Sequence, residues 1–214
     1  MALGCKAIVI ACNTATSAAA AALRAALPLP IIGMEPALKP ASQLPAEGAV
    51  LVMATVMTLR QEKFSRLMER YGRDAVPVPC PGLVELIESG ETDGPKVDRM
   101  LRQYLTPHLD CPVKAVVLGC THYVFLKRSL RALLPEGVRL MDGNAGTARQ
   151  LQSQLLQRGL LRTAPEQPDG EARGSLTFLS TLSDPAVPRR MRAWFERASQ
   201  ELNAACNSPC DTVK

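Results

Sequence analysis

Two cysteines lie in nearly the same local sequence, and their side chains could carry out acid–base chemistry. Residues 6–14 read Lys-Ala-Ile-Val-Ile-Ala-Cys-Asn-Thr, and residues 114–122 read Lys-Ala-Val-Val-Leu-Gly-Cys-Thr-His. In each copy an apolar run precedes a small residue, then a cysteine and two polar residues that open a predicted helix. Cys12 and Cys120 are therefore predicted at the carboxyl ends of parallel strands, where open α/β sheets bind ligands. A chance likeness between two buried strands is the alternative interpretation.

A thiol at such a turn could act as an acid or as a base. The free N–H groups and the dipole of the following helix favour an anion, so we expect a lowered pKa for each thiol. The same N–H groups, with the side chains of Asn13, Thr14 and Thr121, could hold a carboxylate. One thiolate could take a proton from one face of a carbon while the other thiol delivers a proton to the opposite face. This predicts inversion of a stereocentre without redox chemistry or a cofactor, and His122 is the histidine placed to assist Cys120.

Two other interpretations of these residues stay open. Cysteine is often buried at a strand end for packing alone. A zinc site built from Cys12, Cys120 and His122 would lack a fourth ligand and the usual short ligand spacings, so we expect no metal.

The elements that must position the two turns alternate between short strands and helices. The sequence predicts strands at 7–11, 30–33, 49–53, 76–78, 113–118, 138–141 and 175–179, with 76–78 at a sheet edge. It predicts helices at 15–26, 36–43, 59–71, 83–89, 96–105, 123–134, 145–157 and 186–201, and a polar loop at 163–174. This order is typical of an α/β fold with parallel sheets.

The repeat predicts two pseudo-symmetric lobes of parallel βα units with the site between them. We expect residues 1–44 and 142–214 to form the first lobe, incomplete at its N-terminus, and residues 45–141 to form the second.

Composition narrows the function classes. The chain has 214 residues, 47% of them hydrophobic and 21% charged, which is typical of a folded globular protein. The net charge is +5 without a run of five basic residues, and only 4% of residues are aromatic, so nucleic-acid binding is not expected. No apolar run approaches the roughly 18 residues of a membrane span, so no membrane partner is expected. Seven scattered cysteines indicate free thiols in a reducing, cytoplasmic compartment.

Several motifs together resemble the glutamate racemases of the cofactor-independent aspartate/glutamate racemase superfamily. The motifs are Ala11-Cys12-Asn13-Thr14-Ala15, Gly33-Met34-Glu35-Pro36, Ala54-Thr55-Val56-Met57-Thr58, the stretch from Cys80 to Gly90, and Gly119-Cys120-Thr121-His122-Tyr123. The resemblance runs from about Ala2 to Trp194.

The resemblance implies a role for each matching residue. The acid/base pair would be Cys12 and Cys120. Contacts to the substrate, or support of the acid–base groups, would come from Asn13, Thr14, Thr121 and His122. The substrate carboxylates would be contacted by Thr55 and Thr58, and Glu88 would pair with His122. For Thr55 and Thr58 ordinary helix capping is the alternative, and for Glu88 a solvated helix position.

The resemblance also implies a substrate and a pathway. The expected reaction interconverts L- and D-glutamate without a cofactor, and the D-glutamate would serve peptidoglycan synthesis. The alternatives are an aspartate racemase, a related isomerase or decarboxylase, or an inactive protein that only binds an amino acid or a partner. A homodimer is left open by the sequence.

One departure from the family pattern concerns the start of the chain. Family members carry an Asp-Ser-Gly motif and a Tyr-Gly pair before the first cysteine motif, whereas Met1 lies 11 residues before Cys12. About 60 residues, or two βα units, would be needed to supply them. We expect the native chain to extend upstream of Met1, and we expect weak activity and poor solubility without that extension.

Overall fold

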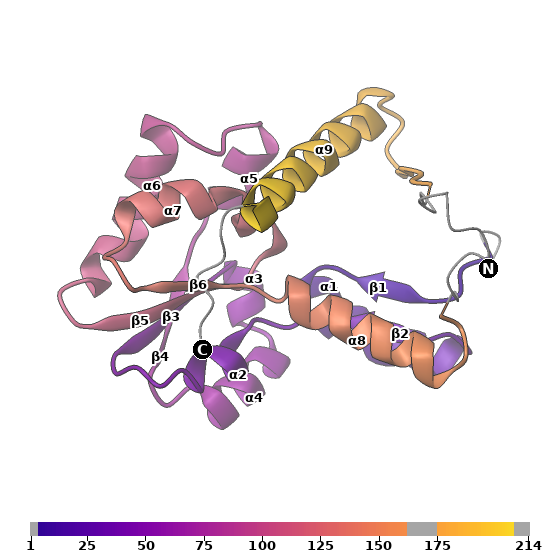
Figure 1. Ribbon diagram of the computed structural model, residues 1–214, viewed down its shortest axis with the longest axis horizontal. Coiled ribbons are helices and arrows are strands. Elements are labelled where there is room, and N and C mark those ends of the chain that lie inside the picture. Colours follow the sequence, from indigo (N-terminus) through magenta and orange to yellow (C-terminus); the bar gives the residue numbers. More distant parts are fainter. Residues whose placement is uncertain (1–3, 162–174, 208–214) are drawn as a thin grey trace. The chain divides into compact units, whose positions relative to one another are not determined.

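The computed structural model describes residues 4–161 and 175–207, with side chains up to residue 200. The chain divides into two compact units, Met1–Arg162 and Thr163–Lys214. The first unit contains both cysteine turns, together with two parallel sheets and the helices that cover them (Figure 1).

Four strands form the larger sheet of the first unit. They are β3 (Ala49–Ala54), β4 (Ala75–Pro79), β5 (Val113–Leu118) and β6 (Arg139–Met141), all parallel, in the order β4-β3-β5-β6. Apart from Lys114, which pairs with Asp74, the central strands β3 and β5 are apolar on both faces, which suits a parallel sheet covered on both sides. Strand β4 carries Pro77 and Pro79, which lack an N–H for a second ladder, and it lies at the predicted edge.

Helices cover both faces of this sheet (Figure 1). They are α2 (Leu38–Ser42), α4 (Glu62–Tyr71), α5 (Leu83–Glu88), α6 (Pro95–Leu105) and α7 (Lys127–Leu133). Leu38 of α2 and Phe64 of α4 pack with Val50, Val52 and Val117 in one buried cluster. Helix α6 packs against α7 and β4.

The smaller sheet pairs β1 (Ile8–Ile10) with β2 (Ile31–Gly33), in parallel. Helix α1 (Asn13–Ala26) packs against both strands, and α8 (Asn144–Gln157) packs against β2. Within the described residues β1 has no second neighbour, and Val9 is 38% exposed although its sequence is typical of a buried strand. The predicted lobe limits at 44/45 and 141/142 stay a prediction.

Two predicted helices are divided by local capping. The predicted helix 59–71 is α3 (Val56–Leu59) followed by α4, because Gln61 between them is extended, with φ −81° and ψ 137°. The predicted helix 123–134 is a 3₁₀ helix, η2 (Thr121–Leu126), followed by α7. A further 3₁₀ turn, η1 (Thr106–His108), follows α6.

The second unit contains α9 (Ala186–Asn207), which begins where the sequence predicts. The strand predicted at 175–179 is wrong, because no strand forms there. Leu176 and Leu179 are exposed, and Phe178 stacks on Phe195 of α9 with 6.1 Å between ring centroids. An aromatic contact thus takes the place of a strand ladder. The predicted loop 163–174 lies outside the described residues.

Candidate active site

The two cysteines occupy matching turns of the backbone. Cys12 lies between β1 and α1 with φ −153° and ψ 127°, and Cys120 lies between β5 and η2 with φ −133° and ψ 138°. Both are extended residues directly before a helical turn, which is the geometry of a helix N-cap. The Cys12 Sγ accepts the N–H of Ala15 at 3.5 Å. The sequence repeat is therefore also a structural repeat.

A buried hydrogen bond ties the two turns together. The Nδ2 of Asn13, next to Cys12, donates to the carbonyl oxygen of Gly119, next to Cys120, at 2.6 Å. Asn13 is only 7% exposed, so this bond is shielded from water. The two strand ends therefore meet, although more than one hundred residues separate them in sequence.

Three hydroxyl groups gather beside the Cys12 turn. Thr58 Oγ1 lies 2.9 Å from Thr14 Oγ1 and 3.0 Å from Thr55 Oγ1. Thr55 Oγ1 also accepts the backbone N–H of Thr58 at 3.1 Å and so caps α3. The capping interpretation of Thr55 is thus correct, and the same hydroxyl also belongs to a cluster that joins α1 to α3.

A second set of polar groups supports Cys120. Its Sγ lies 3.7 Å from His122 Nδ1, and His122 Nε2 lies 3.0 Å from Glu88 Oε1. Because an ionised carboxylate only accepts, Nε2 is assigned the proton, which leaves the Nδ1 lone pair facing the thiol. Glu88 is exposed and paired at the same time, with 66% of its side chain in solvent. Thr121, the other predicted contact, is half-buried at the start of η2.

Burial raises the pKa of the Cys120 thiol above its usual value. The N–H groups of His122 and Tyr123 lower this pKa, and the charges of Cys12 and Glu88 raise it further. The prediction of a lowered pKa is therefore wrong for Cys120, because the loss of water outweighs the N–H groups of the following turn.

Sequence reasoning missed Gln61. Its Nε2 donates to the Thr14 carbonyl at 3.3 Å, which leaves its Oε1 as an acceptor. Gln61 Oε1 and Asn13 Oδ1 are buried and have no hydrogen-bond partner among the described residues. Buried acceptors without a partner are rare and call for a donor, such as the N–H of a ligand or a water molecule. No sequence pattern marks Gln61, because a tertiary fold brings it to Thr14.

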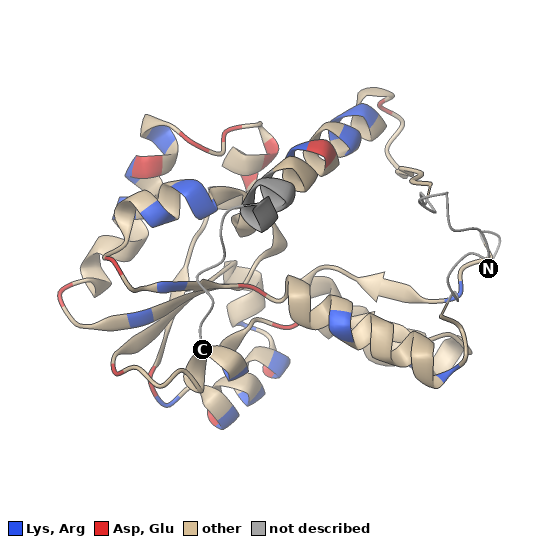
Figure 2. Ribbon diagram, viewed as in Figure 1, with Lys and Arg blue, Asp and Glu red and all other residues tan. Residues whose placement is uncertain are grey.

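A cavity of about 930 Å³ opens next to this cluster. Asn13 and Thr58 line it, whereas neither cysteine is among its described lining residues. Basic residues of α2, α4 and α8 line it. Along α4, acidic and basic residues follow one another closely in the ribbon (Figure 2). The cysteine turns, and not this cavity, thus define the candidate site.

Two classes of feature were sought and not found in the described part of the chain. Among the side chains that the structure describes, in residues 4–161 and 175–200, no cluster of three or more His, Cys, Asp or Glu could hold a metal ion. None of the described helices combines the length and apolar character needed to cross a membrane.

Comparison with known families adds to this geometry. Residues 1–151, about two thirds of the chain and including both cysteine turns, match the family model described as Asp/Glu/Hydantoin racemase. The chain belongs to this family.

Individual members of the Asp/Glu/Hydantoin racemase family resemble the chain over most of its length. A glutamate racemase of Clostridium perfringens is 46% identical over 187 residues, which cover 86% of this chain and 70% of the relative. The crystal structure of Escherichia coli glutamate racemase in complex with L-glutamate and the activator UDP-MurNAc-Ala matches with a TM-score of 0.71 and 30% identity, covering 88% of this chain and 69% of that one. Glutamate racemase from Thermus thermophilus, in complex with β-chloro-D-alanine, matches with a TM-score of 0.66 and 35% identity, covering 91% and 70%. The expected α/β fold and the expected family are thus confirmed.

Proposed function

We propose that the chain is a glutamate racemase, an isomerase that exchanges the two enantiomers by proton transfer at Cα. The observation that carries this proposal is the pair of matching cysteine turns, joined by the Asn13–Gly119 hydrogen bond. The similarity to glutamate racemases supports glutamate as the substrate.

The proposed reaction needs two proton transfers and no other change. The thiolate of one cysteine takes the Cα proton and becomes a thiol, and the electron pair left on Cα delocalises into the α-carboxylate. The thiol of the other cysteine then protonates Cα from the opposite face and becomes a thiolate. Either direction uses the same two groups in reverse order, so Cys12 and Cys120 exchange roles between L- and D-glutamate.

The main energetic problem is the low acidity of the Cα proton. Each unit by which its pKa exceeds that of the thiol costs about 1.36 kcal/mol. Hydrogen-bond donors aimed at the carboxylate reduce this cost because they stabilise the developing charge. We assign this role to Asn13, Thr14 and Thr121, which flank the two thiols in sequence.

His122 would accept the proton of Cys120, and Glu88 would stabilise the protonated His122. Burial favours the thiol form of Cys120, so this residue needs a neighbour that accepts its proton before it can act as a base. The Nδ1 of His122 lies 3.7 Å from the sulfur, and Glu88 would stabilise the imidazolium that results.

The second carboxylate of glutamate would bind at the threonine cluster. There the hydroxyls of Thr55 and Thr58 lie 3.0 Å apart and can turn their protons toward this carboxylate, whereas Thr14, 2.9 Å from Thr58, is assigned to the carboxylate on Cα. A dicarboxylate would therefore span from the cysteine turns to α3.

The cellular setting follows from the reaction and from the thiols. D-Glutamate would supply peptidoglycan synthesis, as the family resemblance implies. Cys5, Cys12, Cys80, Cys111 and Cys120 are all free in the described residues, and thiol catalysis requires a reducing compartment such as the cytoplasm. A homodimer remains a proposal that sedimentation velocity would test.

The decisive experiment replaces each cysteine with serine. Cys12→Ser and Cys120→Ser should each lower racemisation by about 10²- to 10⁴-fold, because a hydroxyl is a far weaker acid than a thiol. Circular dichroism would follow the reaction from either enantiomer. Cys111→Ser, at an exposed thiol just before the start of β5 and so at the opposite end of that strand from Cys120, is the matched control and should keep wild-type activity. Normal turnover in either Cys12→Ser or Cys120→Ser would overturn the two-thiol proposal.

The same assay separates the alternatives. Turnover of aspartate in place of glutamate would indicate an aspartate racemase. Binding of glutamate without exchange of the Cα proton into deuterated water would indicate an inactive binding protein.

A further inference from the structure

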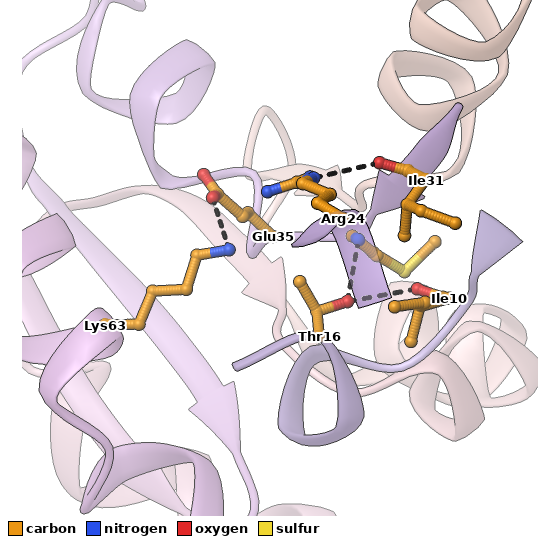
Figure 3. A network of polar contacts seen from close by, with 7 residues as sticks. Ile10, Thr16, Arg24, Ile31, Glu35 and Lys63 are labelled. Carbon is orange, nitrogen blue, oxygen red and sulfur yellow. Dashed lines mark hydrogen bonds and ion pairs between the residues drawn. The ribbon is translucent and has the colours of Figure 1, made fainter. Parts of the chain in front are cut away.

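Thr16, in the first turn of α1, joins the carboxyl ends of β1 and β2. Its hydroxyl donates to the carbonyl oxygen of Ile10 at 3.1 Å and accepts the backbone N–H of Met34 at 3.0 Å (Figure 3). Ile10 is the last residue of β1, and Met34 follows the last residue of β2. The residue is 1% exposed, so both bonds are shielded from water. One buried hydroxyl therefore clamps the open ends of the two strands.

The methyl group of Thr16 is fitted as closely as its hydroxyl. A Cβ added to Gly33 would lie 2.4 Å from Thr16 Cγ2, which is too near for two carbon atoms. Gly33 pairs with Ile10 as the last pair of the β1–β2 ladder. The end of β2 is thus shaped around the Thr16 side chain.

These contacts hold the backbone on both sides of Cys12. The Thr16 hydroxyl fixes the carbonyl of Ile10, two residues before the cysteine. The Thr16 backbone N–H donates to the carbonyl of Cys12 itself at 2.9 Å. Because the position of Sγ follows from the backbone around it, loss of the hydroxyl should redirect the thiol.

The Cys120 turn contains no such clamp. Val124 stands at the position that corresponds to Thr16, four residues after the cysteine, and it has no hydroxyl. Strand β5 lies between β3 and β6, and the N–H of Gly119 donates to the Met53 carbonyl at 2.7 Å. Among the described residues, the second turn follows a strand with a neighbour on each side, whereas the first follows a strand that pairs with β2 and is held there by the Thr16 hydroxyl.

We propose that Thr16 is a positioning residue that aims the Cys12 thiol for its half of the proton transfer. This inference rests on the proposed function for its catalytic consequence. Its structural claim is that the Thr16 hydroxyl orients the Cys12 thiol and does not orient the Cys120 thiol.

Thr16→Val removes the hydroxyl and keeps the shape, and Thr16→Ser keeps the hydroxyl and removes the methyl. Thr147→Val is the matched control, because Thr147 is also a first-turn helix threonine and bonds only to Gly143 O, at 2.8 Å. Thr16→Val should lower kcat by about 10- to 100-fold, the cost of a misplacement near 1 Å, with little change in KM. Thr16→Ser should recover most of that loss, and Thr147→Val should behave as wild type.

Primary deuterium isotope effects distinguish a positioning role from general loosening. Because the equilibrium constant of a racemisation is one, kcat/KM must fall equally in both directions, whichever thiol is displaced. In Thr16→Val, however, the isotope effect should rise for the Cα-deuterated enantiomer that gives its proton to Cys12 and fall for the other. Isotope effects that match those of wild type in both directions would overturn the proposal.

Alkylation provides a readout that does not require activity. In full-length Thr16→Val, iodoacetamide should label Cys12 severalfold more slowly than in wild type, because the displaced thiolate loses the N–H of Ala15. Labelling of Cys120, measured in the same digest by mass spectrometry, should not change. Equal changes at both thiols, or the same change in Thr147→Val, would contradict a specific role for Thr16. If wild type lacks racemase activity, the proposed function fails, and the alkylation ratio still decides the role of Thr16.

Discussion

The two cysteine turns share a sequence and a backbone shape, yet different forces hold them in place. Strand β5, which leads to Cys120, has a neighbour on each side and buries Val116 and Val117 completely. Strand β1, which leads to Cys12, pairs with β2 alone in the described residues and leaves Val9 38% exposed. Within the described residues, the Cys120 turn is thus held by the burial of its strand and the Cys12 turn by the hydrogen bonds of Thr16, while the Asn13–Gly119 bond joins the two turns. The repeated sequence therefore determines the local backbone geometry of each turn, whereas the contacts that stabilise each turn come from different neighbouring residues.

The chemical supports of the thiols differ in the same way. The Cys120 thiol lies beside the imidazole of His122, which in turn contacts the Glu88 carboxylate. The Cys12 thiol instead accepts a backbone N–H and lies next to hydroxyl groups. The proposed mechanism requires both thiols to gain and lose a proton in every round trip. The two thiols must therefore carry out equivalent proton transfers in different surroundings. Substitutions near Cys12 and substitutions near Cys120 can test this difference separately.

The largest expected effect is a loss of stability at alkaline pH that originates around the second turn. Burial raises the pKa of Cys80 from 9.0 to about 12, and it also raises the pKa of Tyr123, whose hydroxyl donates to the Cys80 carbonyl. A group with a raised pKa stabilises the fold while both states are protonated, and this contribution is lost as the pH rises from about 9 towards 12. For Cys80 the full loss is about 4 kcal/mol in the free energy of unfolding.

Urea unfolding from neutral pH to about pH 10.5 would measure about half of this loss, because that pH lies midway between 9.0 and about 12. Cys80→Ala should flatten the decline, whereas Cys111→Ala, at an exposed thiol, should leave it unchanged. If wild type and Cys80→Ala lose stability in parallel, the burial around the second turn is not the cause.

The next effect concerns the small residue before each cysteine. A Cβ on Gly119 would lie 2.6 Å from the Met53 carbonyl oxygen, whereas Ala11, at the matching position of the first turn, is exposed. Gly119→Ala should therefore cost about 1–3 kcal/mol of stability through overpacking. The reciprocal change, Ala11→Gly, should cost about 1 kcal/mol or less. Thermal unfolding of the two variants compares the turns directly, and equal losses would mean that they are packed alike.

The smallest effect is expected at Glu88, the exposed carboxylate that contacts His122 beside Cys120. Glu88→Gln keeps an oxygen near His122 Nε2 but removes the charge that stabilises an imidazolium. Because 66% of the Glu88 side chain is in solvent, kcat should fall by only about tenfold or less. Glu91→Gln, which removes a carboxylate paired with Lys96, is the control for lost charge alone. A pH profile of kcat that is identical in wild type and Glu88→Gln would remove Glu88 from the mechanism.

Much of the fold could be predicted because it depends on local sequence. The apolar runs of β3 and β5 and the proline-bearing edge strand β4 lie where periodicity places them. Residues 175–179 show the limit of this approach, since alternation alone does not supply a partner strand. The break between α3 and α4 was missed because it depends on an extended Gln61, a residue without a strong preference for that role.

The candidate site could be predicted only in part, for a related reason. The motifs contain Cys12, Cys120, Asn13 and His122, and the sequence repeat indicates that the two turns correspond. Burial of Cys120 cannot be read from its motif, and this reversed the direction expected for its pKa. The roles of Thr16 and Gln61 depend on contacts with distant strands and helices, which no motif encodes.

The Asn13–Gly119 hydrogen bond limits how far the two cysteine turns can separate. It lies one residue from each cysteine, so a movement that pulled the turns apart would have to break this buried bond. While the bond holds, the backbone beside one reacting thiol stays tied to the backbone beside the other.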